Sequence, residues 1–248
     1  MDLTLRDRFL KLWRERFDKS DLPIAFYYTD REDVELAPPV SGGHRCIIGM
    51  LAQIRDGKPF RFDSDTAGCP GAKRYLGFTQ ELRPGFEHFL SSGIPGQLEG
   101  ERYKKTPDLV RELIAKAPRF TAPARYIVFK RWDGLTAAED PDVVIFYARP
   151  DVLSGLFTLA NFDEAMANAV ITPFAAGCGA IVLYPYLEGK GDRPRAVLGT
   201  FDVSARPFVP ADVLSFAIPM SKFQRMVANM DESFLITPSW QKVRNRFS

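Results

Sequence analysis

Cysteine and histidine are scarce in this chain, which contains three cysteines and two histidines among 248 residues. The two histidines, His44 and His88, are too few for a histidine-rich metal site. No nucleophile-elbow phrase supports a Ser-His-Asp triad. A small, odd number of cysteines also argues against a disulfide framework. We therefore expect a protein of the reducing cytoplasm.

Long apolar runs and an excess of basic charge are missing as well. No stretch approaches the ~20 apolar residues needed to cross a bilayer, and Asp2, Arg6 and Asp7 interrupt the N-terminus before a targeting segment forms. The formal net charge is +2, and lysine and arginine are scattered rather than gathered into the basic stripe of a nucleic-acid binder. The sequence predicts neither a membrane nor a nucleic-acid partner, and it leaves the oligomeric state open.

Familiar cofactor motifs are absent too. Gly189-Lys190 lacks the upstream glycine and the following Ser or Thr of a phosphate-binding loop. Gly177-Cys178-Gly179 resembles the first half of a dinucleotide fingerprint, but Val182 stands where the third glycine belongs. The sequence therefore does not point to nucleotide chemistry.

The chain has ample material for a folded core. Hydrophobic residues make up 46% of it, with twenty phenylalanines and eight tyrosines, so we expect a folded chain. Strands are expected at Leu22–Tyr28, Arg125–Lys130, Val143–Ala148, Ala196–Val203 and Val213–Ile218. The fold class predicted is α+β, a single mixed-sheet domain over residues 1–248 with helices packed around it. Two weakly related halves remain open, because Ile24-Ala25-Phe26-Tyr27 and Val144-Ile145-Phe146-Tyr147 echo each other.

Helices are indicated between these strands. Leu5, Phe9, Leu12, Trp13 and Phe17 share one face of a first helix. Thr106-Pro107-Asp108 and Thr237-Pro238-Ser239 are capped helix starts. Further helices are expected over 82–90, as a pair over 151–169 with a break near Asn161, and from Pro219 to Met230. Residues 181–187 fit either a strand or a helix.

All three cysteines lie in small-residue, turn-like phrases. Ala67-Gly68-Cys69-Pro70-Gly71-Ala72 and Ala176-Gly177-Cys178-Gly179-Ala180 nearly repeat each other, and Cys46 follows the pair Gly42-Gly43. Pro70 suits a first helical turn and places Cys69 at the cap. Cys46 would lie in the first turn of a helix over 46–54, and Cys178 would lie similarly if a helix begins there. The free amides of a helix start favour a thiolate.

Three thiolates near three helix starts have the donor chemistry for zinc or an iron–sulfur cluster. The fourth ligand would be water, substrate, His44 or a carboxylate. Against this, the cysteines are widely separated with no C-x-x-C pair, and free cysteine often packs as a small hydrophobe. His44 is read as a loop residue or as a helper of Cys46. Asp202 and Arg206 are read as an anion-binding element or as a surface ion pair.

The order of these phrases resembles the DUF169 family, described as uncharacterised ArCR proteins. The resemblance rests on Pro23-Ile24-Ala25-Phe26, on Cys46 before an apolar helix, and on Cys69-Pro70-Gly71-Ala72 followed by Tyr75-Leu76-Gly77-Phe78. It continues with Cys178 and Asp202-Val203-Ser204-Ala205-Arg206, and spans about residues 8–230. It implies that Cys46, Cys69 and Cys178 belong to a shared pattern, with Arg206 as a companion. It brings no activity with it.

Three functional hypotheses follow. In the first, Cys46, Cys69 and Cys178 converge and ligate an iron–sulfur cluster or zinc, with His44 and Arg206 as ligand-binding residues for a small anion and redox or Lewis-acid chemistry if the protein is an enzyme. In the second, the chain is a non-catalytic domain that binds a small molecule or a partner, and its cysteines are packed in the core. In the third, Cys69 alone is a reactive thiol. The distances among the cysteines discriminate the first two.

Overall fold

One mixed sheet organises the part of the chain that the computed structural model describes, residues 1–32, 46–54 and 57–247. Its strands are Ile24–Thr29 (β1), Phe60–Phe62 (β2), Tyr126–Arg131 (β3), Val143–Ala148 (β4), Val170–Ile171 (β5), Ala196–Gly199 (β6) and Leu214–Pro219 (β7). The described strands form a seven-stranded sheet in the order β2-β3-β1-β4-β7-β6-β5. Only β5 and β6 pair in parallel; the other neighbours are antiparallel.

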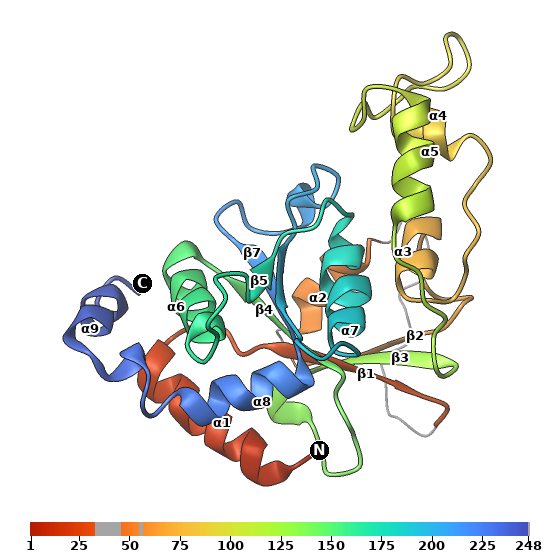
Figure 1. Ribbon diagram of the computed structural model, residues 1–248. Helices are drawn as coiled ribbons and strands as arrows, with labels where there is room; N and C mark the ends of the chain where they lie inside the picture. The colour runs from red at the N-terminus through yellow and green to blue at the C-terminus, as the bar shows by residue number, and fades with distance from the viewer. Residues whose placement is uncertain (33–45, 55–56, 248) are drawn as a thin grey trace.

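Helices cover both faces of this sheet (Figure 1). They are Leu3–Phe17 (α1), Ile47–Ile54 (α2), Pro70–Tyr75 (α3), Phe86–Phe89 (α4), Pro107–Lys116 (α5), Pro150–Asn161 (α6), Tyr184–Glu188 (α7), Met220–Asn229 (α8) and Pro238–Arg244 (α9). Helices α1, α6, α8 and α9 gather on one face, and α2, α3 and α7 lie on the other, while α4 and α5 extend outward. The predicted α+β class is confirmed.

Strand β4 explains why the structure has two cores. Its side chains alternate between the faces, so Val144 and Phe146 pack with α1 and α8, while Val143 and Ile145 pack with α2. All six of its residues are buried. The uniformly apolar sequence of this strand is therefore a consequence of cover on both faces.

The strand order reads alike in both directions from the central β1–β4 pair. On one side β3 and then β2 follow, and on the other side β7 and then β6, with β5 added at the edge. In each half, the first strand is central, the last lies beside it and a middle strand lies outside. The echoing phrases of the sequence fall in β1 and β4, the two central strands; whether the halves are related stays a prediction. The helices α2 and α7 occupy equivalent places in this order. The chain leads from α2 to β2, which lies outside β3, and from α7 to β6, which lies outside β7.

Local signals predicted several elements correctly. Thr106 and Thr237 cap α5 and α9 with their side chains, and a proline opens each helix. The open choice over 181–187 is decided for a helix, since π-helical turns at Gly179–Leu183 run directly into α7. These turns continue from a helical start at Gly177 and Cys178.

Other predictions were wrong in extent. The helix expected over 82–90 is only α4, and the second helix of 151–169 is absent from the described residues, because the chain turns after α6 and leads to β5. The strand expected through Val203 ends at Gly199, because Thr200 adopts a left-handed conformation with φ of 61°. The Thr200 hydroxyl accepts a hydrogen bond from the Ser215 amide at 2.9 Å and thereby holds this turn.

Candidate functional site

Cys69 is the N-cap residue of α3, as its position before Pro70 predicts. Its backbone is extended, and its sulfur accepts a hydrogen bond from the Ala72 amide with an N···S distance of 3.3 Å. The side chain is half-buried and packs against the core beneath α2 and α7. A cysteine sulfur therefore takes the place that a serine or aspartate oxygen usually occupies at a helix start.

Cys46 immediately precedes α2, and its carbonyl accepts the first hydrogen bond of that helix, from the Met50 amide at 3.1 Å. Burial raises the pKa of the Cys46 thiol, while hydrogen bonds from the amides of Gly49 and Ile48 act in the opposite direction. Burial outweighs these amides. The amides at the helix start thus act on the thiolate in the expected direction, but the pKa of Cys46 is raised overall.

Cys178 lies in the first turn of the helical stretch that ends in α7. The residue keeps some solvent-accessible surface, yet burial of its thiol raises its pKa well above the usual value. The neighbouring thiols of Cys69 and Cys46 raise it further. At Cys178, as at Cys46, burial of the thiol therefore outweighs the effect of the helix start on its pKa.

The two glycines beside Cys178 allow other segments to approach its backbone. A Cβ atom on Gly177 would lie 2.9 Å from Ile48 Cγ1 in α2 and 3.1 Å from Ala205 Cβ. A Cβ atom on Gly179 would lie 2.9 Å from the Tyr75 ring, at the end of α3. The two contacts at 2.9 Å are closer than real Cβ atoms make, and the contact at 3.1 Å is tighter than nearly all of them. The small-residue phrase is therefore explained by close packing of α2 and α3 on either side of Cys178.

The structure brings the three cysteines together. Cys46 interacts electrostatically with Cys69, and Cys178 interacts with both of the others. The Asp202 carboxylate joins the group, because its charge acts on Cys46 and on Cys178. We call these three thiols and this carboxylate the cysteine cluster. Within residues 1–32, 46–54 and 57–247, however, no group of three or more His, Cys, Asp or Glu is arranged so that it could hold a metal ion.

The other two predicted site residues are not part of this geometry. His44 lies outside the described residues. Arg206 donates hydrogen bonds to the carbonyls of Val213 at 2.6 Å, Ala211 at 2.7 Å and Pro210 at 3.1 Å. It thus holds the turn before β7, and its role in binding a ligand stays a prediction.

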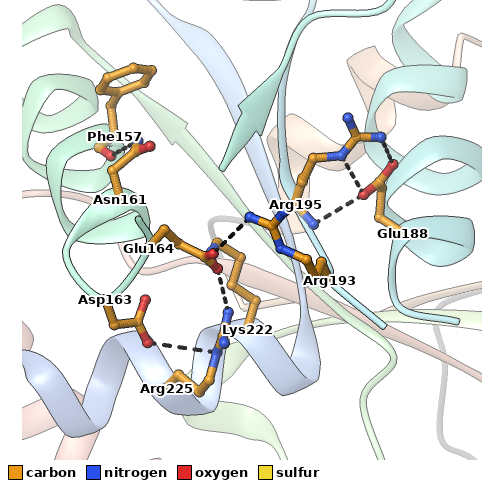
Figure 2. Close-up of polar contacts among 9 residues, drawn as sticks. All are labelled: Phe157, Asn161, Asp163, Glu164, Glu188, Arg193, Arg195, Lys222 and Arg225. Atoms are coloured by element: carbon orange, nitrogen blue, oxygen red, sulfur yellow. Dashed lines mark hydrogen bonds and ion pairs between the residues drawn. The ribbon is translucent and has the colours of Figure 1, made fainter. Parts of the chain in front are cut away.

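A charged cluster that the sequence analysis missed joins the segment after α6, the end of α7, the segment before β6 and α8 (Figure 2). Glu164, which follows α6 and is 11% exposed, binds Lys222 at 3.1 Å, Arg225 at 2.8 Å and Arg193 at 3.3 Å. Nearby, Glu188 accepts two side-chain hydrogen bonds from Arg195, at 2.9 and 2.6 Å. Glu164, Glu188, Arg193 and Arg195 border a cavity of about 330 Å³. Because its cations are already paired with the carboxylates, we assign the cluster a structural role.

This cluster predicts how stability depends on pH. Hydrogen bonding to Lys222 is the main reason that the pKa of Glu164 is lowered from 4.5 to about 2. A lowered pKa stabilises the fold fully above about pH 4.5, and that contribution is lost as the pH falls toward about 2. Between about pH 5 and about pH 3, denaturant titrations should show a steeper loss of free energy of unfolding for the wild type than for Glu164→Gln. If the free energy of unfolding falls equally with pH in the two proteins, the structural role assigned to the charged cluster is contradicted.

No described helix has both the length and the apolar character needed to cross a membrane.

Comparisons with known proteins identify the family. No curated protein and no solved structure matches the chain. The pattern of one family, DUF169, matches residues 15–229, which include all three cysteines and Asp202. The chain belongs to the DUF169 family, described as uncharacterised ArCR.

Proposed function

We propose that Cys46, Cys69 and Cys178 together ligate an iron–sulfur cluster and that the protein uses it for redox chemistry, or for Lewis-acid chemistry on a small anion. One observation carries the proposal. Three cysteines from distant parts of the chain begin three helical segments, and their thiols act electrostatically on one another. Thiolate groups are the usual ligands of such clusters.

A cluster fits the donors better than a single zinc ion does. Zinc holds each sulfur at about 2.3 Å, so all ligands of one ion crowd around one point. In a cluster each cysteine binds a different iron atom, so the sulfurs lie farther apart. Amides that point at the sulfurs, as those of Ala72 and Gly49 do, tune the reduction potential of such centres.

The charge of the site is consistent with a cationic occupant. With three thiols and a carboxylate close together, each negative charge disfavours ionisation of the next group, and burial adds to the effect. Metal ions reverse this balance, since a coordinating thiol is deprotonated outright. The reduced thiols that such a site requires also fit the reducing cytoplasm, which we propose as the location.

The second candidate is a non-catalytic binding domain with structural cysteines. The packing of Cys46 and Cys69 against the core favours it, as does the raised pKa of Cys46 and Cys178, because a neutral buried thiol behaves as a small hydrophobe. The two candidates differ in what the purified protein contains.

Anaerobic purification, followed by treatment with ferrous iron and sulfide, tests the proposal. We expect stoichiometric iron and sulfide with charge-transfer absorption, and severalfold less iron in each of Cys46→Ser, Cys69→Ser and Cys178→Ser. Tyr75→Phe is the matched control, because it keeps the ring against Gly179 and removes only a hydroxyl beside Cys178. A colourless wild type with no bound iron would overturn the cluster and leave the second candidate.

A further inference from the structure

Residues 78–121 leave the body of the protein as one excursion, which we call the arm and which carries α4 and α5 outward (Figure 1). Its two ends meet, because the Ala122 amide donates a hydrogen bond to the Gly77 carbonyl at 2.9 Å. Gly77 has a φ of 82°, and a Cβ atom there would lie 2.6 Å from the Ala122 nitrogen. The Phe120 ring packs on Tyr186, with ring centroids 4.9 Å apart. The arm is therefore joined to the body through a narrow, closely packed base.

The segment of the arm that returns toward α5 is tied to α4 by backbone hydrogen bonds. The Glu101 amide donates to the Phe89 carbonyl at 2.7 Å, and the Lys104 amide donates to the Leu90 carbonyl at 3.0 Å. Arg102, between them, adopts a left-handed conformation with φ of 56°. These bonds hold residues 101–104 in a fixed position relative to α4.

This return segment touches the body at two points, which we call the latch. Lys104 Nζ lies 4.0 Å from the centroid of the Phe174 ring. The Tyr103 hydroxyl lies within hydrogen-bonding reach of the Ser204 hydroxyl, which itself donates a hydrogen bond to Asp202 Oδ2 at 2.9 Å. Phe174 is 59% exposed, and a cation–π contact at an exposed site is weak. The latch is therefore much less firmly held than the base of the arm.

The body side of the latch belongs to segments that pack beside Cys178. Ser204 precedes Ala205, whose Cβ atom lies 3.1 Å from the position of a Cβ atom on Gly177. Phe174 lies four residues before Cys178, at the approach to the same helical stretch. The Cys178 thiol is buried, so a reagent reaches it only when neighbouring segments move apart.

The segment after Ser204 also reaches the helix that follows Cys46. Phe208 Cδ1 lies 3.1 Å from the position of a Cβ atom on Gly49, in the first turn of α2. Residues 204–208 therefore lie beside the starts of both helical segments, and the arm rests on these residues through the latch.

We propose that the arm is a cover over the cysteine cluster, held in place by Tyr103 on Ser204 and by Lys104 on Phe174. When the latch opens, the arm turns about its base and small molecules from the solvent reach the thiols of Cys46 and Cys178. This inference goes beyond the proposed function, because it concerns access to the thiols and not what they bind.

The rate of alkylation by N-ethylmaleimide in the reduced, metal-free protein tests the cover, with peptide mass spectrometry assigning each modified cysteine. We expect the double variant Tyr103→Phe, Lys104→Met to react severalfold faster than the wild type at Cys178 and Cys46. The reagent is uncharged, and removing a cation disfavours a nearby thiolate. A faster reaction therefore reports access to the thiols and not their ionisation.

Two matched controls change similar side chains outside the latch. Lys105→Met replaces the exposed neighbour of Lys104, and Phe157→Ala removes a phenylalanine that is 49% exposed on α6, over the other face of the sheet. Both should react at the wild-type rate. If the double variant also reacts at that rate, the arm is not a cover.

Phe174→Trp separates opening of the latch from a loss of folding. Tryptophan presents the best ring for a cation–π contact, so this variant should react more slowly than the wild type at Cys178, a result that unfolding cannot produce. A rate equal to or above that of the wild type would contradict the role of Lys104 in the latch. Because the protein is free of metal, these rates do not depend on whether it binds iron.

Discussion

Replacing Glu164 with alanine should lower the free energy of unfolding by about 3–5 kcal/mol, the usual cost of removing one partner from a buried ion pair. Lys222 is 1% exposed, and Glu164 is the one partner that the described contacts give its ammonium group. Without the carboxylate, that ammonium either stays charged and unpaired or loses its proton. Both cost free energy. Urea titration at neutral pH measures the loss.

Two further variants test whether the buried ion pair is the cause of this loss of stability. Glu112→Ala removes an exposed helical pair with Lys116 and should leave the free energy of unfolding close to that of the wild type. The double variant Glu164→Leu, Lys222→Met replaces both charges with apolar groups and should recover much of the stability. If Glu164→Ala costs no more than Glu112→Ala, the buried pair does not stabilise the fold.

Gly177→Val should prevent the assembly of the cysteine cluster. Its Cβ atom would lie 2.9 Å from Ile48 Cγ1 and 3.1 Å from Ala205 Cβ, and two further methyl groups would enlarge the clash. Overpacking of this kind costs about 1–3 kcal/mol. The displacement separates α2 from Cys178, so we also expect a severalfold loss of iron after reconstitution. Iron analysis and thermal denaturation measure the two effects.

The control for this substitution is Gly134→Val. A Cβ atom on Gly134, in the short 3-10 turn Trp132–Gly134, meets nothing within 4 Å. The same change of side chain should therefore leave iron binding unchanged there. A Gly177→Val protein that folds and binds as much iron as Gly134→Val would show that the close packing beside Cys178 does not position the cluster.

Local sequence signals determined the helix starts and the central strands of this protein. Pro70 predicts the cap at Cys69, and the predicted capped starts at Thr106 and Thr237 are confirmed. Such predictions succeed because a cap involves only residues within one turn. The apolar run of β4 indicated burial on both faces for a similar reason, since side-chain alternation along a strand depends on the local backbone alone.

The errors fall where distant contacts decide the chain path. After Asn161 the chain has helical periodicity, but the ion pairs of Glu164 with Lys222 and Arg225 hold it against α8 instead. After Gly199 the β-favouring sequence continues, but Thr200 turns and bonds Ser215 of the neighbouring strand. Local propensity is worth less than these tertiary interactions.

The cysteine cluster divides in the same way. The sequence by itself determined that three cysteines occupy small-residue phrases at or near helix starts. Only the tertiary structure decided that these starts meet. Helices α2, α3 and the helix from Gly177 pack in the same core on one face of the sheet, and the glycines beside Cys178 allow their close approach. It also decided that Asp202 bonds the Ser204 hydroxyl while Arg206 bonds the carbonyls of a neighbouring turn, since a spacing of four residues does not fix where either side chain points.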